Sequence, residues 1–215
     1  LMAYRAFHSA RSFDGKMWIP LWQTGDKPYL QEGGSFVFDE DGRPLVQAWE
    51  PDQTDNYRAR FVADPEAALG SILTGMGMLA GDELAGERIA VAWETRDPED
   101  EQSCFSDTTH LDIIGNASGI QQAWMGTLAG SEGPGPAVWL ESLSPEAALA
   151  MKDSLIQMMT AVEAIPAPFD QAIQAPDDSP ERAAVEQAIE ALEAQAAATV
   201  TASEVLGLRI NLEGG

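Results

Sequence analysis

The chain has 215 residues, of which 45% are hydrophobic and 7% aromatic, so it can bury a core and is not disordered. Its formal net charge is −23, and residues 61–215 hold 26 acidic but five basic side chains. This charge excludes nucleic acid as a partner, because a polyanion would be repelled and no basic stripe exists to displace its counterions. Cations are the expected partners of so acidic a surface.

The single cysteine, Cys104, excludes an intramolecular disulfide and a cysteine-based zinc site. No apolar run approaches the roughly 20 residues that a membrane-spanning helix needs. The chain contains no basic-then-apolar signal peptide and begins at Leu1 rather than at a methionine. We therefore expect a fragment of a longer protein.

Residues 1–48 are rich in Gly, Trp, Phe and Pro and follow no steady period. Turn residues at Gly33–Gly34 and Asp39–Gly42 flank the short apolar run Phe36–Phe38. This pattern predicts a small hairpin or an irregular lead-in.

Helical patterns begin after residue 49. Asp64–Glu66 supplies an N-cap, a proline at the first helical position and an early acid, which together predict a helix start. Gly81–Asp82 is expected to break or bend this helix before a second one at Glu83–Glu94. The polar stretch Thr95–Ser106 predicts a loop.

A third helix is predicted from Asp107 and ends at the glycines of residues 126–135. A fourth follows over Ser144–Ile165, and a fifth begins at Ser179. Phe169, between the last two, is expected to plug the end of the bundle. Antiparallel helices joined by short Pro/Gly loops predict an all-α, up-and-down helical bundle with an irregular N-terminal lead-in.

Two polar segments are candidates for a functional site. In the first, Glu83 and Glu87 lie one helical turn apart, so they could share a divalent cation or be held by an arginine. The alternative is an acidic pair on the surface, which is common on helices. Gly86 between them favours the close approach of another group.

The second segment runs from Asp97 to His110 and holds acids, hydroxyls, Cys104 and one of the two histidines. Carboxylate oxygens and imidazole suit iron or zinc, although no spacing here matches a recognised zinc motif. The alternative is that Ser106 or Asp107 caps the third helix while the other acids are solvated. Cys104 is expected to pack as a small hydrophobe.

Read together, these strings resemble the iron-regulated members of the imelysin family in order and spacing across roughly residues 46–126. The matching strings are Asn56–Arg58, Ile72–Gly77, Glu83–Arg88, Glu99–Asp107 and His110. Pro168–Asp170 and Leu206–Gly207 extend the resemblance more weakly toward the C-terminus.

The resemblance implies an all-helical protein of two bundle-like halves, located in the periplasm or cell envelope and linked to iron acquisition. The family is also classed as metallopeptidases. Residues 46–215 would form the C-terminal helical bundle, and residues 1–45 an irregular or incomplete remnant of the N-terminal half, either truncated or disturbed in reading frame. Outer-membrane or periplasmic proteins are expected partners.

The chain departs from the family's pattern in two segments. The nearest counterpart of the Gly-x-His-x-x-Glu motif is Ala6–Arg11, in which His8 would correspond but Arg11 replaces the glutamate. Arginine cannot act as a metal ligand. Gln102 and Thr108 stand where the family usually has histidine and asparagine. These changes count against an intact metallopeptidase centre.

The leading hypothesis is a polar site between helices that binds a metal ion, iron or zinc, or a small iron-related ligand. The predicted ligand-binding residues are Glu83, Glu87, Arg88, Ser106 and Asp107, and the predicted metal ligands are His8, Glu87, Glu101, Asp107 and His110. One alternative is a metallopeptidase of the imelysin type, for which no catalytic residues are identified. Another is a structural helical module without a site, which gains support if Glu87, Arg88 and Asp107 all face water.

Overall fold

The computed structural model describes four strands between residues 11 and 49, and then residues 61–128 and 131–212. The chain divides into two compact units between Ala63 and Asp64. Every predicted site residue belongs to the second unit except His8, which lies outside the described residues.

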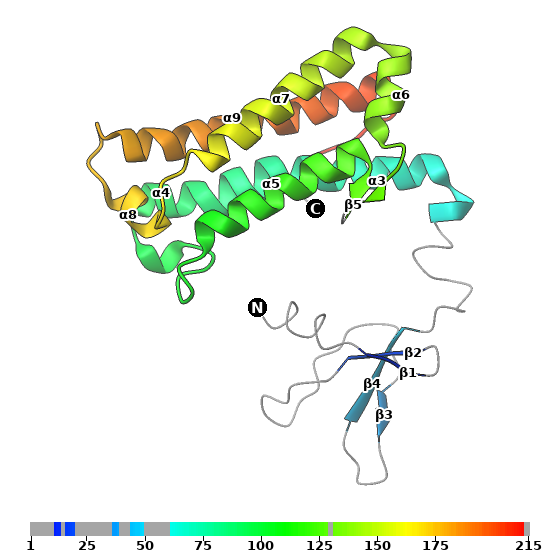
Figure 1. Ribbon diagram of the computed structural model, residues 1–215, viewed down its shortest axis with the longest axis horizontal. Coiled ribbons are helices and arrows are strands. Elements are labelled where there is room, and N and C mark those ends of the chain that lie inside the picture. The colour runs from blue at the N-terminus through cyan, green and yellow to red at the C-terminus, as the bar shows by residue number, and fades with distance from the viewer. Residues whose placement is uncertain are drawn as a thin grey trace. The chain divides into compact units, whose positions relative to one another are not determined.

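Four short strands form an antiparallel sheet in the first unit, with the order β1-β2-β4-β3 (Figure 1). They are β1 (Arg11–Phe13), β2 (Lys16–Ile19), β3 (Phe36–Phe38) and β4 (Pro44–Trp49). The segment predicted as a hairpin or an irregular lead-in therefore contains a sheet. Strands of three to six residues are too short to show a clear alternation in the sequence.

The second unit opens with one continuous helix made of α3 (Pro65–Met78), the π-helical segment η1 (Leu79–Ala90) and α4 (Val91–Thr95). Asp64 caps it as predicted, because its Oδ1 accepts a hydrogen bond from the Ala67 amide at 3.0 Å. Of the predicted break or bend at Gly81–Asp82, the break does not occur, because the helix continues there with π-helical winding. Gly81 instead lies against α9, where an added Cβ would be 3.0 Å from that of Ala196, so the glycine serves close helix packing.

The remaining helices run back and forth beside this first one (Figure 1). They are α5 (Thr109–Met125), α6 (Pro136–Leu143), α7 (Pro145–Glu163), α8 (Phe169–Gln174) and α9 (Pro180–Val205). The predicted all-α, up-and-down bundle is confirmed. Helix α6 was not predicted, because the glycines and prolines around it indicated only a loop. No helix of the described chain is both long and apolar enough to span a membrane.

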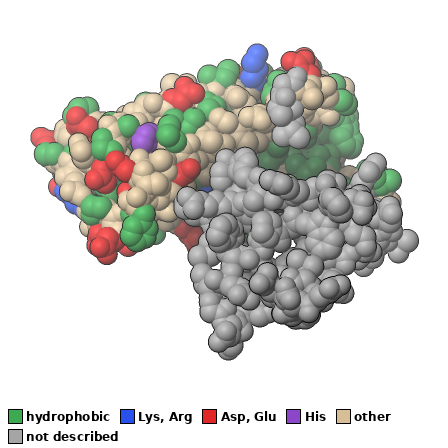
Figure 2. All heavy atoms as spheres, turned by 60° about the horizontal axis from the view of Figure 1, so that its bottom comes forward, with side chains coloured by type: hydrophobic (Ala, Val, Ile, Leu, Met, Phe, Trp, Pro, Cys, Tyr) green, Lys and Arg blue, Asp and Glu red, His purple; other side chains and the backbone are tan. Residues whose placement is uncertain are grey.

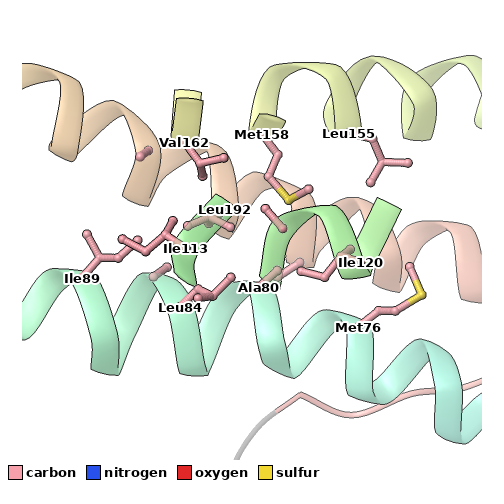
Figure 3. Packing of buried hydrophobic residues seen from close by; sticks show 14 of the residues in the cluster. Met76, Ala80, Leu84, Ile89, Ile113, Ile120, Leu155, Met158, Val162 and Leu192 are labelled. Atoms are coloured by element: carbon pink, nitrogen blue, oxygen red, sulfur yellow. The ribbon is translucent and has the colours of Figure 1, made fainter. Parts of the chain in front are cut away.

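The core lies where α9 packs against both α7 and η1 (Figure 3). Residues from four helices meet there with no exposed surface, among them Leu84, Ile113, Met158, Val162 and Leu192. Burying each of these side chains contributes about 1.5–3 kcal/mol, so this seam supplies much of the stability of the bundle. Met151 and Met158 of α7 therefore pack in the core.

Between α5 and α6 the chain folds back through a hairpin of β5 (Thr127–Leu128) and β6 (Ser131–Glu132). Gly126 begins the reversal at φ 74°, and its carbonyl accepts the Gly133 amide at 2.9 Å. Gly135 then passes so close to the end of α5 that an added Cβ would lie 2.4 Å from backbone atoms of residues 124–126. The start of α6 depends on this contact.

Gly135→Ala should lower the free energy of unfolding by about 2 kcal/mol or more, because the new methyl group would overlap backbone atoms that cannot move independently. Gly75→Ala is the matched control, since nothing lies within 4 Å of the Cβ that it adds on α3. It should leave the free energy of unfolding unchanged or raise it by up to about 1 kcal/mol. Urea denaturation measures both, and equal effects would contradict this packing.

Candidate functional site

Polar side chains gather inside the protein at one end of the bundle, which we call the α8 end. It comprises α4, the 3-10 turn η2 (Pro98–Asp100), the turn of residues 101–107, the first turns of α5 and α9, and α8 (Figure 1). Most of the second polar segment of the sequence falls here. The geometry of this end decides which of the predicted residues share a site.

Glu101 is the most deeply buried acid of the described chain, with 5% of its surface exposed. The Thr109 hydroxyl hydrogen-bonds its carboxyl group. The other carboxyl oxygen, Oε2, is buried and has no hydrogen-bond partner. A buried carboxylate oxygen without a partner is costly, so Glu101 is suited to a proton or a cation that reaches it from outside the chain.

Burial raises the pKa of Glu101 above its ordinary value of 4.5. The hydrogen bond from Thr109 lowers the pKa, while the negative charges of Asp170 and Asp107 raise it further and His110 lowers it. The folded protein therefore holds a proton on Glu101 at pH values where an exposed glutamate is ionised.

His110, in the first turn of α5, lies close enough to Glu101 to influence its pKa. The Nδ1 atom of its half-buried ring is shielded from water and has no hydrogen-bond partner. A carboxylate oxygen and an imidazole nitrogen at this end of the bundle are thus both buried without a hydrogen-bond partner. Both are common ligands of iron and zinc.

Ser103 holds the turn of residues 101–107 onto α5. Its amide donates to the Thr109 hydroxyl at 3.1 Å, and its own hydroxyl donates to Asp112. Its carbonyl accepts the amides of Ser106 and Asp107 at 3.0 and 2.9 Å. These bonds fix the path of the chain between Glu101 and His110, which keeps the two side chains at the same end of the bundle.

Ser106 and Asp107, both predicted ligand residues, are exposed on this turn. The Ser106 hydroxyl bonds to the Ser103 carbonyl and to Thr108, and Asp107 adopts φ 52°, a left-handed conformation that Asp tolerates. Neither caps α5, because Thr108 occupies the N-cap position and makes no capping bond with its side chain. They shape the turn, and Asp107 also acts on Glu101 through its charge.

The first polar segment forms a separate contact on the π-helix. Arg88 donates to Glu83 at 2.6 Å in a partly exposed ion pair, and Glu87 is exposed. In an α-helix Glu83 and Arg88, which are five residues apart, would point in directions roughly 140° from each other. The π winding instead brings their side chains to one side of the helix. Among the described residues, no hydrogen bond or ion pair joins Glu83, Glu87 or Arg88 to Glu101 or His110.

The predicted residues therefore form two groups, Glu83 with Arg88 and Glu101 with Asp107 and His110. Within the described ranges, no three His, Cys, Asp or Glu side chains are placed to hold a metal ion together. Sequence reasoning missed Thr109 and Asp170, which both act on Glu101. Asp170 belongs to the string Pro168–Asp170, whose weak family resemblance was the available signal.

The raised pKa of Glu101 makes stability depend on pH. Because the folded state holds this proton more tightly than the unfolded state, its contribution is complete below pH 4.5 and is lost as the pH rises through the folded pKa. Glu101→Gln, which mimics the neutral acid, should therefore match the original chain near pH 4 and be more stable than it at pH 8. Urea denaturation of metal-stripped protein across this range measures the difference.

Glu99→Gln is the control for this measurement, because Glu99 is exposed on η2 two residues away. The difference in free energy of unfolding between Glu99→Gln and the original chain should not follow the same trend with pH. If the free energies of unfolding of Glu101→Gln and the original chain differ by the same amount from pH 4 to pH 8, that result would contradict the burial of an ionisable carboxyl group at this position.

The sequence also matches the model of a known protein family. The family model described as Imelysin, a peptidase family, matches residues 39–199, which is most of the chain and includes Glu101, His110 and the π-helix. No curated protein matches the chain. The chain therefore belongs to the imelysin family.

Proposed function

We propose that this chain is a periplasmic protein linked to iron acquisition, and that it binds a metal cation, iron or zinc, at the α8 end of its bundle. Glu101 and His110 would be its protein ligands. The observation that carries the proposal is the pair of buried atoms without partners, Oε2 of Glu101 and Nδ1 of His110, in side chains that interact electrostatically. A cation would satisfy both atoms at once.

The surroundings favour a cation over any other occupant. Asp107 and Asp170 add negative charge around Glu101, and acidic side chains form several patches on the visible face of the helical unit (Figure 2). A bound cation would replace the proton on Glu101 and stabilise the ionised carboxylate that burial otherwise disfavours. Thr109, bonded to both Glu101 and Ser103, would orient the carboxylate as an outer-shell partner.

The arrangement supports binding rather than peptide hydrolysis. A zinc peptidase needs three protein ligands, a metal-bound water and a general base that takes a proton from it. Among the described residues no three His, Cys, Asp or Glu side chains are placed to hold a metal ion, and Arg11 replaces the glutamate of the family's histidine motif. A bound metal would carry its remaining ligands from water or from a small chelating molecule.

A purely structural module is supported by some residues and not by others. Glu87 and Asp107 are exposed and Arg88 is paired at the surface, so these three need no ligand to explain them. Glu101 is harder to explain in a purely structural module, because an apolar side chain would serve that role better in a site with 5% exposure. Membership of the imelysin family supports the proposed periplasmic location, and partners among envelope proteins are part of the same proposal.

Titration calorimetry of the metal-stripped chain with ferrous, ferric and zinc ions tests the proposal. Saturable binding near micromolar is expected for at least one ion, and Glu101→Gln should weaken it by a factor of about 100 or more, because it removes a direct ligand. His110→Asn should weaken it comparably. Glu99→Gln, which removes an equal charge from the surface two residues away, should change the affinity by less than about threefold.

Two results would contradict the proposal. One is that Glu99→Gln and Glu101→Gln weaken binding equally, which would indicate diffuse attraction of cations to the acidic surface. The other is weak binding that disappears with added salt in the original chain, because exposed charges are screened and a buried site is not.

A further inference from the structure

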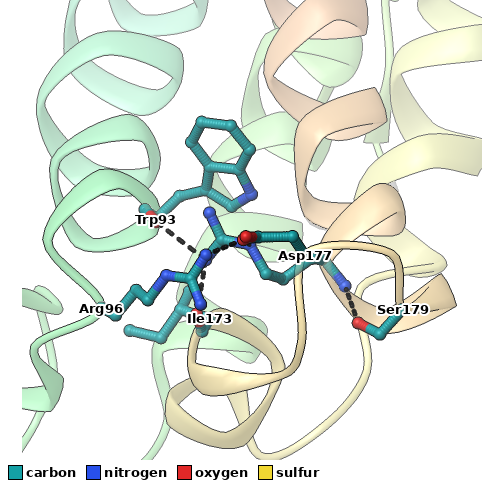
Figure 4. A network of polar contacts seen from close by, with 6 residues as sticks. Trp93, Arg96, Ile173, Asp177 and Ser179 are labelled. Carbon is teal, nitrogen blue, oxygen red and sulfur yellow. Dashed lines mark hydrogen bonds and ion pairs between the residues drawn. The ribbon is translucent and has the colours of Figure 1, made fainter.

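A second polar cluster at the α8 end is built around two arginines (Figure 4). Arg182, in the first turn of α9, is buried, and its Nη1 donates to the carbonyls of Trp93 at 3.0 Å and Ile173 at 2.6 Å. Its guanidinium carbon lies 4.5 Å from the centroid of the Trp93 ring. The group is thus held rigidly between α4, α8 and α9.

Both arginines turn toward one carboxylate. Arg96 donates from Nη2 to Oδ1 of Asp177, and Nε of Arg182 lies 3.8 Å from the same oxygen. The Asp177 side chain is 83% exposed, and its other oxygen makes no hydrogen bond within the described chain. Two guanidinium groups therefore share one exposed acid, and the negative charge of Glu186 also acts on Arg182.

Several features of this cluster oppose a purely structural explanation. Arg182 occupies a helix N-terminus, where the helix dipole disfavours a cation, and both burial and the charge of Arg96 lower its pKa. Two of the five basic residues after position 60 thus meet where their charges repel each other.

Trp93 adds a donor that is not used. Its indole nitrogen is buried and has no hydrogen-bond partner, and in Figure 4 it lies on the edge of the ring nearest to the arginines and Asp177. A buried donor without an acceptor is costly. An incoming oxygen atom could accept from this indole as well as from the guanidinium groups.

We propose that Arg96 and Arg182 form a binding subsite for an oxyanion, a phosphate or carboxylate group on a small ligand, and that Asp177 occupies this subsite as an internal substitute. Guanidinium groups bind such anions through paired, charge-assisted hydrogen bonds. Asp177 is exposed enough to swing into water when a competing anion arrives. This subsite uses none of the residues proposed for the cation, so either proposal can fail without the other.

Titration of the metal-stripped, full chain with inorganic phosphate and, separately, with succinate tests the subsite. The signal is the indole N–H resonance of Trp93 in nitrogen-15 spectra, assigned with Trp93→Phe. Asp177→Asn removes the competing carboxylate and should lower the Kd for at least one of the two anions about tenfold. Asp178→Asn, at the exposed neighbouring acid, is the matched control and should leave the Kd as in the original chain.

Adding Arg96→Gln to Asp177→Asn should abolish the saturable shift, while Arg96→Lys should restore part of it. Thermal unfolding of each variant checks that the bundle is intact. Saturation by phosphate alone or by succinate alone supports the subsite and identifies the anion. Equal Kd values for Asp177→Asn and Asp178→Asn, or saturation that survives Arg96→Gln in a folded chain, would overturn the proposal.

Discussion

The packing of α9 against both α7 and the π-helical segment η1 is the contact on which the rest of the helical unit depends. Small residues such as Gly81 and Ala196 bring the helices close, and Leu192 fills the space between them. Gln195 fixes the pairing, because it accepts from Ser154 on α7 at 2.7 Å and donates to Thr199 at 3.3 Å. Polar atoms buried in this seam are therefore satisfied, which specifies one register of α7 on α9.

The α8 end differs from that seam in one physical respect. Its buried polar groups are only partly satisfied, since Glu101, His110 and Trp93 each keep an atom without a hydrogen bond. In the core, by contrast, the buried side chain of Gln195 has hydrogen-bond partners, so packing of the bundle alone does not explain why these three atoms lack them. The contrast within one protein supports a ligand-binding role for this end, and the rigid bundle holds its parts in place.

The sequence predicted the bundle because its strongest signals are local. Caps such as Asp64 and Ser144 and the apolar period of α7 act within a few residues and are all found in the structure. The break that was one of two predicted outcomes at Gly81–Asp82 does not occur, because packing against α9 overrides the low helix propensity of glycine. The sequence could not predict which site residues lie together. Glu83 pairs with Arg88 because of the π winding, and Glu101 differs from the other acids in being buried. Both features depend on distant parts of the chain.

A crystal structure of the full chain grown with ferrous iron under anaerobic conditions, with data collected at the iron absorption edge, tests the central claim most directly. The account predicts an anomalous peak between Glu101 and His110, about 2.0–2.2 Å from a carboxylate oxygen and from Nδ1. It also predicts that the peak disappears in Glu101→Gln crystals grown in the same way. A peak bound only by exposed acids such as Glu87 or Glu99, with Glu101 and His110 unchanged, would contradict it.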